Sequence, residues 1–143
     1  MKKHLLSLVV LMLFATGAWA QNLSPLGIWT NEEGKARFEI YKCGDKLCGK
    51  IVSLKEPLRN GKPKMDDNNP DKKLRSRKLQ GLEFMKGFAY EGANKWDNGT
   101  IYDPESGKTY SCYMKMVGKN KMEVKGYIGI SLIGRAQNWT RVD

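Results

Sequence analysis

The residues that could carry chemistry in this chain are few. The only histidine, His4, lies within the first twenty residues, so residues 21–143 contain no imidazole. Ser-His-Asp or Cys-His catalysis would lack its usual base, and a zinc site would lack its commonest neutral ligand. We therefore expect no enzyme, no catalytic residue, no metal and no cofactor. A hydrolase that uses carboxylates is kept as a third hypothesis, because acids distant in sequence can converge in a fold.

A short acidic run resembles the start of a calcium loop. Asp67, Asn69 and Asp71 have the right spacing, but Lys72 stands where the loop needs glycine and Lys78 where it needs a bidentate acid. These side chains are better suited to turns and helix capping.

The cysteines point to one disulfide. Cys43 and Cys48 lie on either side of a turn, and we expect them to face each other across a hairpin, with Ile40 opposite Ile51. Cys112 lies on the apolar face of its own segment and is expected to be a buried thiol.

A basic cluster occupies Lys72, Lys73, Arg75, Arg77 and Lys78. It is either an anion-binding lip, with Arg75 and Arg77 as candidate ligand contacts, or a solvated loop. Aromatic residues do not alternate with these charges, which disfavours nucleic acid as a partner.

The first twenty residues have the pattern of a cleaved export signal. Lys2-Lys3 precede the apolar run Leu5–Phe14, and Ala18-Trp19-Ala20 provides a small-x-small cleavage site. An uncleaved N-terminal anchor is the alternative. Residues 21–143 then form one domain, with 23 Lys and Arg against 15 Asp and Glu, a net charge of +8. No later segment is long and apolar enough for a membrane span, so we expect a periplasmic or secreted protein.

Period-two alternation between turn residues predicts an all-β fold. The expected strands are 27–31, 36–43, 47–54, 82–90, 99–103, 108–117, 121–128 and 135–142. Tight connections between them suggest either an antiparallel up-and-down barrel of about eight strands or a sandwich. The exception is one long irregular connection near 55–81, in which a short helical turn is expected near Pro70, capped by Asn69.

The inward faces supply candidate ligand contacts. Tyr110, Met114 and Met116 share one face, as do Phe84 and Phe88 on another strand, and all five are candidates. Lys86 shares the second face. If that face is inward, Lys86 needs an anionic group inside the barrel. If the strand turns the other way, Met85, Gly87 and Ala89 line the interior and Lys86 is ordinary surface.

The two ends of the chain suggest a plug for the barrel. Gly27-Ile28-Trp29 opens the first strand, and Trp29 can close one end while an arginine of the last strand covers its ring. Arg135 and Arg141 are both candidates for that arginine.

Several longer motifs resemble a known family. They are Asp66–Asp71, Leu74–Gly81, Trp96–Tyr110 and the segment from Gly126-Tyr127-Ile128-Gly129 through Gly134-Arg135 to Trp139. Together they resemble the small exported bacterial proteins grouped as domain of unknown function twenty-one forty-seven. The resemblance covers nearly the whole of residues 21–143. It implies a lipocalin-like, calycin-type barrel in the bacterial envelope, with no established reaction and no catalytic residues to transfer.

Two binding hypotheses follow. In the first, the barrel holds a small apolar or amphipathic ligand. In the second, the barrel is solid and binds an anionic envelope component or a protein partner through its basic surface. The choice depends on whether the barrel is hollow, which spacing does not determine. Spacing is equally silent on oligomeric state.

Overall fold

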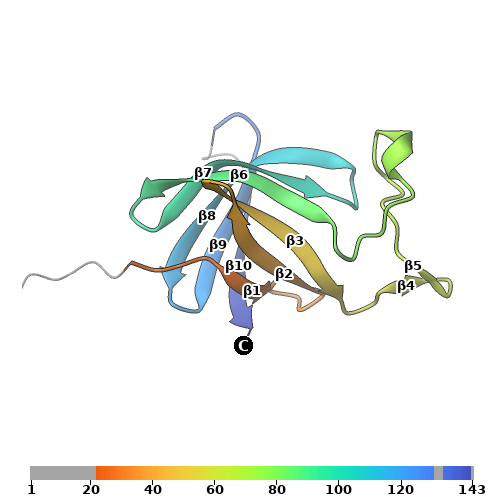
Figure 1. Ribbon diagram of the computed structural model, residues 1–143, viewed down its shortest axis with the longest axis horizontal. Helices are drawn as coiled ribbons and strands as arrows, with labels where there is room; N and C mark the ends of the chain where they lie inside the picture. The colour runs from red at the N-terminus through yellow and green to blue at the C-terminus, as the bar shows by residue number, and fades with distance from the viewer. Residues whose placement is uncertain (1–21, 131–133, 143) are drawn as a thin grey trace, which may run out of the picture.

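The computed structural model describes residues 22–130 and 134–142, and within them eight antiparallel strands close into a barrel (Figure 1). Around the barrel the order is β1, β10, β9, β8, β7, β6, β3, β2. The bounds are β1 Gly27–Thr30, β2 Ala36–Cys43, β3 Lys46–Leu54, β6 Glu83–Gly92, β7 Lys95–Asp103, β8 Lys108–Gly118, β9 Lys121–Tyr127 and β10 Gly134–Val142. The expected all-β fold is confirmed, and of the barrel and the sandwich the structure shows the barrel. The expected export signal at 1–20 lies outside the described residues.

The β2–β3 hairpin contains the expected disulfide in a different register. Cys43 and Cys48 are bonded, with their Cα atoms 5.8 Å apart. However, Cys43 lies opposite Lys46 and Tyr41 opposite Cys48, so the bond is diagonal rather than directly across the hairpin. The expected pairing of Ile40 with Ile51 is therefore wrong. The cause is the two-residue turn Gly44-Asp45, whose Gly44 has a φ of +64°, a value that suits a tight hairpin.

Alternation also fails on β6. Phe84 and Met85 are both buried although they are consecutive, and Phe88 is buried three residues later. The β3–β6 pairing shifts register on both sides of Gly49, and Gly87 has a φ of +81°. Such irregularities re-aim side chains within a strand, and here Lys86 is turned into solvent. Of the two orientations considered for Lys86, the inward one is wrong.

Residues 55–81 form an excursion from one end of the barrel, between β3 and β6. The excursion contains a small hairpin, β4 (Leu58–Arg59) and β5 (Lys62–Pro63), and a 3₁₀ turn, η1 (Lys72–Leu74). The 3₁₀ turn begins later than expected. Its cap is Asp71, which accepts a hydrogen bond from the Lys73 amide, rather than Asn69. Asn69 instead accepts from the amide of Asp71.

Among the described residues, no helix has the length and the apolar composition needed to cross a bilayer.

Candidate anion-binding surface

A buried carboxylate fastens the excursion to the barrel. Asp66 has no exposed surface. Its Oδ1 accepts a hydrogen bond from the Tyr102 hydroxyl on β7 at 2.6 Å, and its Oδ2 accepts from Asn69 Nδ2 at 2.8 Å and Arg77 Nε at 2.9 Å. The Asp66 amide also donates to the Arg77 carbonyl. We call Asp66, Asn69, Arg77 and Tyr102 the latch, because they join both arms of the excursion to a barrel strand.

The latch holds its carboxylate ionised. Burial alone would raise the pKa of Asp66, but the hydrogen bonds from Tyr102, Asn69 and Arg77 outweigh it and hold the pKa below its usual value. Burial and the bond to Asp66 raise the pKa of Tyr102 to about 12, so this phenol stays a donor. The latch is therefore a fully paired charge network at neutral pH.

A second tether lies beside the latch. Asn68 Nδ2 donates to the carbonyls of Pro104 and Glu105, in the β7–β8 turn, at 3.3 and 2.9 Å. Gly107 in the same turn has a φ of +72°, and a Cβ there would lie 2.1 Å from the Asn68 carbonyl oxygen. Only glycine permits this close approach. Two independent contacts thus fix the excursion against the barrel.

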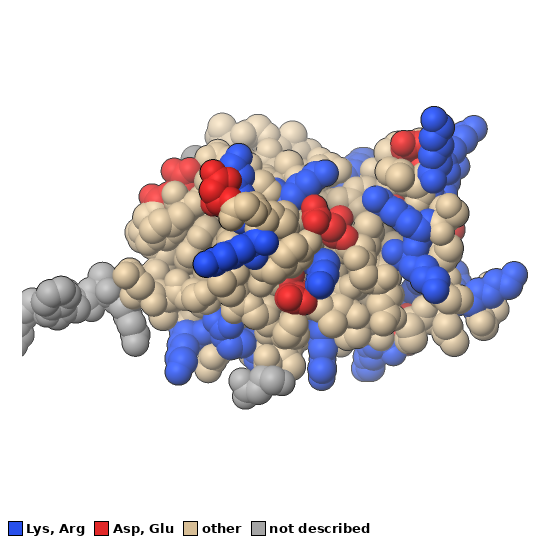
Figure 2. Space-filling model, viewed as in Figure 1, with Lys and Arg blue, Asp and Glu red and all other residues tan. Residues whose placement is uncertain are grey.

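The expected basic cluster divides into two groups. Arg77 is used in the latch, and Arg75 donates its Nε to the Asn69 carbonyl at 2.7 Å. Lys72, Lys73 and Lys78 are exposed and form no ion pair within the described part of the chain. Figure 2 shows Lys and Arg side chains gathered over the excursion, at the right-hand end of the molecule. The arginines therefore hold the segment in place while the lysines stay available.

The acidic run that resembles a calcium loop is used internally. Asp67 pairs with Arg59 at 3.4 Å, Asn69 bonds Asp66, and Asp71 caps η1. A separate cluster of Cys43, Cys48 and Glu83 brings metal-ligating atoms together, but its two sulfurs are joined in the disulfide.

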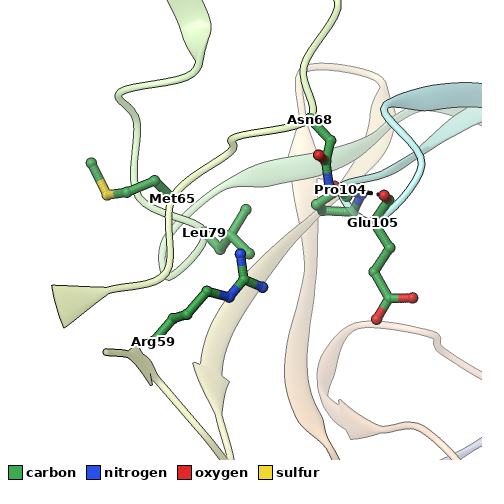
Figure 3. A pocket seen from close by; sticks show the side chains of 6 residues that line it. All are labelled: Arg59, Met65, Asn68, Leu79, Pro104 and Glu105. Carbon is green, nitrogen blue, oxygen red and sulfur yellow. Dashed lines mark hydrogen bonds between the residues drawn. The ribbon is translucent and has the colours of Figure 1, made fainter. Parts of the chain in front are cut away.

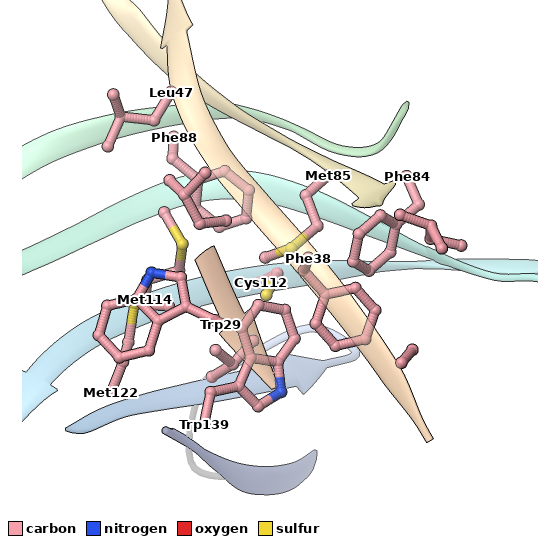
Figure 4. Packing of buried hydrophobic residues seen from close by; sticks show 14 of the residues in the cluster. Trp29, Phe38, Leu47, Phe84, Met85, Phe88, Cys112, Met114, Met122 and Trp139 are labelled. Atoms are coloured by element: carbon pink, nitrogen blue, oxygen red, sulfur yellow. The ribbon is translucent and has the colours of Figure 1, made fainter. Parts of the chain in front are cut away.

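The inward candidates lie in a packed core (Figure 4). Phe84, Phe88, Met114 and Met116 are buried, while Tyr110 at the rim is half-buried. A void that admits water would leave accessible surface on the side chains around it. None remains on the side chains that fill the centre, which are Trp29, Met85, Cys112, Met114 and Met122.

Glycines show how tightly the centre is packed. A Cβ at Gly99 would lie 2.5–2.6 Å from three ring carbons of Phe88, and one at Gly49 would lie 3.0 Å from both Ile40 and Met85. These strands approach the core closely because they carry no side chain there. Burial raises the pKa of the Cys112 thiol well above its usual range, in keeping with an inert core residue.

The plug at the opposite end is built around Trp29. The Arg141 guanidinium lies 4.4 Å from the centre of the Trp29 ring and donates to the carbonyls of Leu26 and Ser24. Gly27 has a φ of +125°, and a Cβ there would lie 2.8 Å from Arg141 Nη1. Trp29 Nε1 donates to the Pro25 carbonyl at 2.8 Å.

Arg135, the other candidate for the arginine over Trp29, lies at the other end of β10, opposite Gly126, and is exposed.

Residues of the excursion line two grooves. Met65 and Lys78, which form an isolated antiparallel β-bridge, line one groove each. The first has a volume of about 260 Å³, and Figure 3 shows its lining residues Arg59, Met65, Asn68, Leu79, Pro104 and Glu105. The second has about 310 Å³ and is lined by Pro57, Leu58, Pro63, Lys64, Lys78 and Gln80. The first contains a carboxylate, whereas the second contains two lysines and no acid.

The family model DUF2147, described as an uncharacterised protein conserved in bacteria, matches residues 27–141. The chain belongs to this family. The match begins at Gly27 and ends at Arg141, the two residues that meet at the plug, so the DUF2147 region coincides with the closed barrel and its excursion.

A solved structure is similar to this DUF2147 chain in fold. It is protein HP1028 from the human pathogen Helicobacter pylori, described as belonging to the lipocalin family. It has a TM-score of 0.77 and 21% sequence identity, and 85% of each chain is covered. The likeness shows a lipocalin-like barrel. No curated protein matches the sequence.

Sequence reasoning missed the latch. Neither Asp66 nor Tyr102 is among the candidate residues that the sequence predicts. The two are 36 positions apart in the sequence. The signals that could have pointed to them are an acid among turn residues, Asp66, and a tyrosine within a predicted strand, Tyr102.

Proposed function

We propose that this protein is a non-enzymatic binding protein of the bacterial envelope that recognises an anionic component through the outer surface of the 55–81 excursion. One observation carries the proposal. The latch and the second tether hold a charged segment in a fixed position, and Lys72, Lys73 and Lys78 are left exposed without ion pairs among the described residues. If the basic cluster were only a solvated loop, it would not need a buried carboxylate to hold it in place.

Charge supports the choice of ligand. The excursion contains nine Lys and Arg against four Asp and Glu, a net charge of +5. Of the four acids, Asp66 and Asp67 are paired with arginines inside the segment. The outward field is therefore positive, which attracts polyanions and raises their association rate.

The location rests on three observations. The family is bacterial, the Cys43–Cys48 disulfide is a bond that persists in oxidising compartments, and residues 1–20 have the pattern of an export signal. All three suit the periplasm or the outside of the cell.

The other binding hypothesis places a small apolar ligand inside the barrel. Lipocalin-like folds suit such cargo, but Phe88, Met114 and Met122 would have to move apart to admit it. Well-packed interiors resist such rearrangement. The exposed excursion needs no such change, and for this reason we favour the outer surface.

The proposal is tested by retention of the exported protein on immobilised heparin, a polyanion that contains no lipid. We expect the protein to be retained at low salt and to elute as the salt concentration rises, because salt screens the contacts. Lys72→Glu with Lys73→Glu should weaken binding about tenfold or more, because two attractions become two repulsions. Lys42→Glu with Lys46→Glu is the matched control, since these exposed lysines lie on the hairpin at the other end of the barrel. Equal losses in the two double variants would reject a site on the excursion and leave only net charge.

A further inference from the structure

The excursion has two protruding tips, and each carries an exposed leucine. The first tip is the β4–β5 hairpin, whose turn Asn60-Gly61 has φ values of 52° and 75°, and the second is η1. Both project from the same end of the barrel (Figure 1). Leu58 in β4 is 54% exposed, and Leu74 in η1 is 38% exposed.

Both leucines have basic neighbours in the sequence. Leu74 stands between Lys73 and Arg75, and Leu58 is followed by Arg59. Single exposed apolar residues are common on protein surfaces and need no explanation. Two of them at the tips of a tethered basic segment form a combination that a purely electrostatic surface would not require.

The second groove extends the apolar area around Leu58. Pro57 and Pro63 line it together with Leu58, and the other lining residues are Lys64, Lys78 and Gln80, with no acid among them. Proline and leucine offer apolar contact, and a lysine can keep its stem on apolar atoms while its ammonium reaches outward to an anion. The groove thus combines apolar and cationic side chains, as the tips do.

We propose that the excursion docks on an anionic lipid surface, with Leu58 and Leu74 entering the headgroup region and the surrounding lysines contacting lipid phosphates. This inference rests on the proposed function and names its partner. Peripheral proteins bind such surfaces by combining shallow burial of apolar side chains with attraction of Lys and Arg to anionic headgroups. A soluble polyanion would engage the lysines and give the leucines no role.

The test compares two probes on the same variants of the exported protein. The first probe is vesicles of phosphatidylcholine with phosphatidylglycerol, measured by co-sedimentation against pure phosphatidylcholine vesicles. The second probe is soluble heparin. Leu58→Ser with Leu74→Ser removes the apolar contacts and keeps every charge. Val117→Ser is the matched control, because Val117 is 51% exposed but lies near the end of β8, away from the excursion.

We expect wild type to bind the phosphatidylglycerol vesicles and not the neutral ones. The leucine double variant should bind those vesicles about tenfold more weakly, since each partly exposed leucine loses part of its transfer free energy, and it should bind heparin as wild type does. Val117→Ser should match wild type on both probes. A leucine variant that binds vesicles normally, or a wild type that binds heparin and not anionic vesicles, would overturn lipid docking and leave the proposed function standing. A wild type that binds neither would reject both.

Because Leu58 and Leu74 are exposed, both variants should fold, and a thermal melt of each one checks this. Separate Leu58→Ser and Leu74→Ser variants assign the contact to one tip or both. If neither the single variants nor the double variant weakens vesicle binding, the inference is contradicted.

Discussion

Removing the Asp66 carboxylate should release the excursion while leaving the barrel assembled. Three donors converge on this side chain at 2.6–2.9 Å, and it has no exposed surface. Breaking a buried ion pair by deleting one partner costs about 3–5 kcal/mol. We expect Asp66→Ala to lie at the lower end, about 3 kcal/mol, because the Arg77 side chain is already 37% exposed and can be hydrated.

The asparagine variant refines this estimate. Asp66→Asn can keep an oxygen toward Asn69 and Arg77 and turn its amide nitrogen toward the Tyr102 hydroxyl, which can rotate to accept. Only the charge is then lost, and the expected cost falls to about 1.5–3 kcal/mol, the contribution of one charge-assisted hydrogen bond. The ranking of the two variants follows from which atoms accept which bonds.

The assay is urea unfolding at pH 7 combined with limited proteolysis that maps cleavage to residues 55–81. If the excursion opens first, cleavage there rises before global unfolding changes. Asp67→Asn is the control, because its partner Arg59 is exposed and its 3.4 Å pair should contribute no more than about 1 kcal/mol. Were Asp66→Ala to match Asp67→Asn in both stability and cleavage, the latch would have no structural role and the account of the excursion would fail.

Three further outcomes are expected. Gly99→Ala should destabilise the barrel by about 1–3 kcal/mol, because its Cβ would overlap the Phe88 ring. Gly118→Ala, which has open space around it, should change the stability to urea little, and equal effects of the two variants would argue for a loose interior. Arg141→Ala should lower the unfolding midpoint and expose Trp29, seen as a red-shifted emission; an unchanged spectrum would contradict the plug. Because the pKa of Asp66 is lowered in the folded protein, its contribution to stability is complete above the ordinary pKa of about 3.9 and is lost as pH falls through the folded pKa. Cleavage at 55–81 should therefore rise on acidification in wild type and stay flat in Asp66→Asn.

The strands could be predicted because their alternation is local. Residues such as Met114 and Met116 alternate with polar neighbours, and this pattern is sufficient to place β8 to within a residue of its observed bounds. The disulfide was predictable for the same reason, since its cysteines flank one short turn. Its register was not, because the two-residue turn at Gly44 moves every pair of the hairpin.

The remainder depends on contacts that strand periodicity does not encode. Phe84 and Met85 are both buried because β6 is irregular against β3, which moves Lys86 to the surface. The latch joins Asp66 to Tyr102 across 36 positions of sequence. The filling of the interior depends on how Phe88 seats against Gly99, a matter of rotamers and strand approach rather than of composition.

We propose that recognition occurs on the excursion and not inside the barrel. A chemical-shift titration of the isotope-labelled protein with a short heparin oligosaccharide tests this. We predict salt-sensitive shifts at the amides of Lys72, Lys73 and Lys78, with Phe88, Cys112 and Met114 unchanged. Shifts confined to those three core residues, with the excursion silent, would contradict the account and return the ligand to the interior.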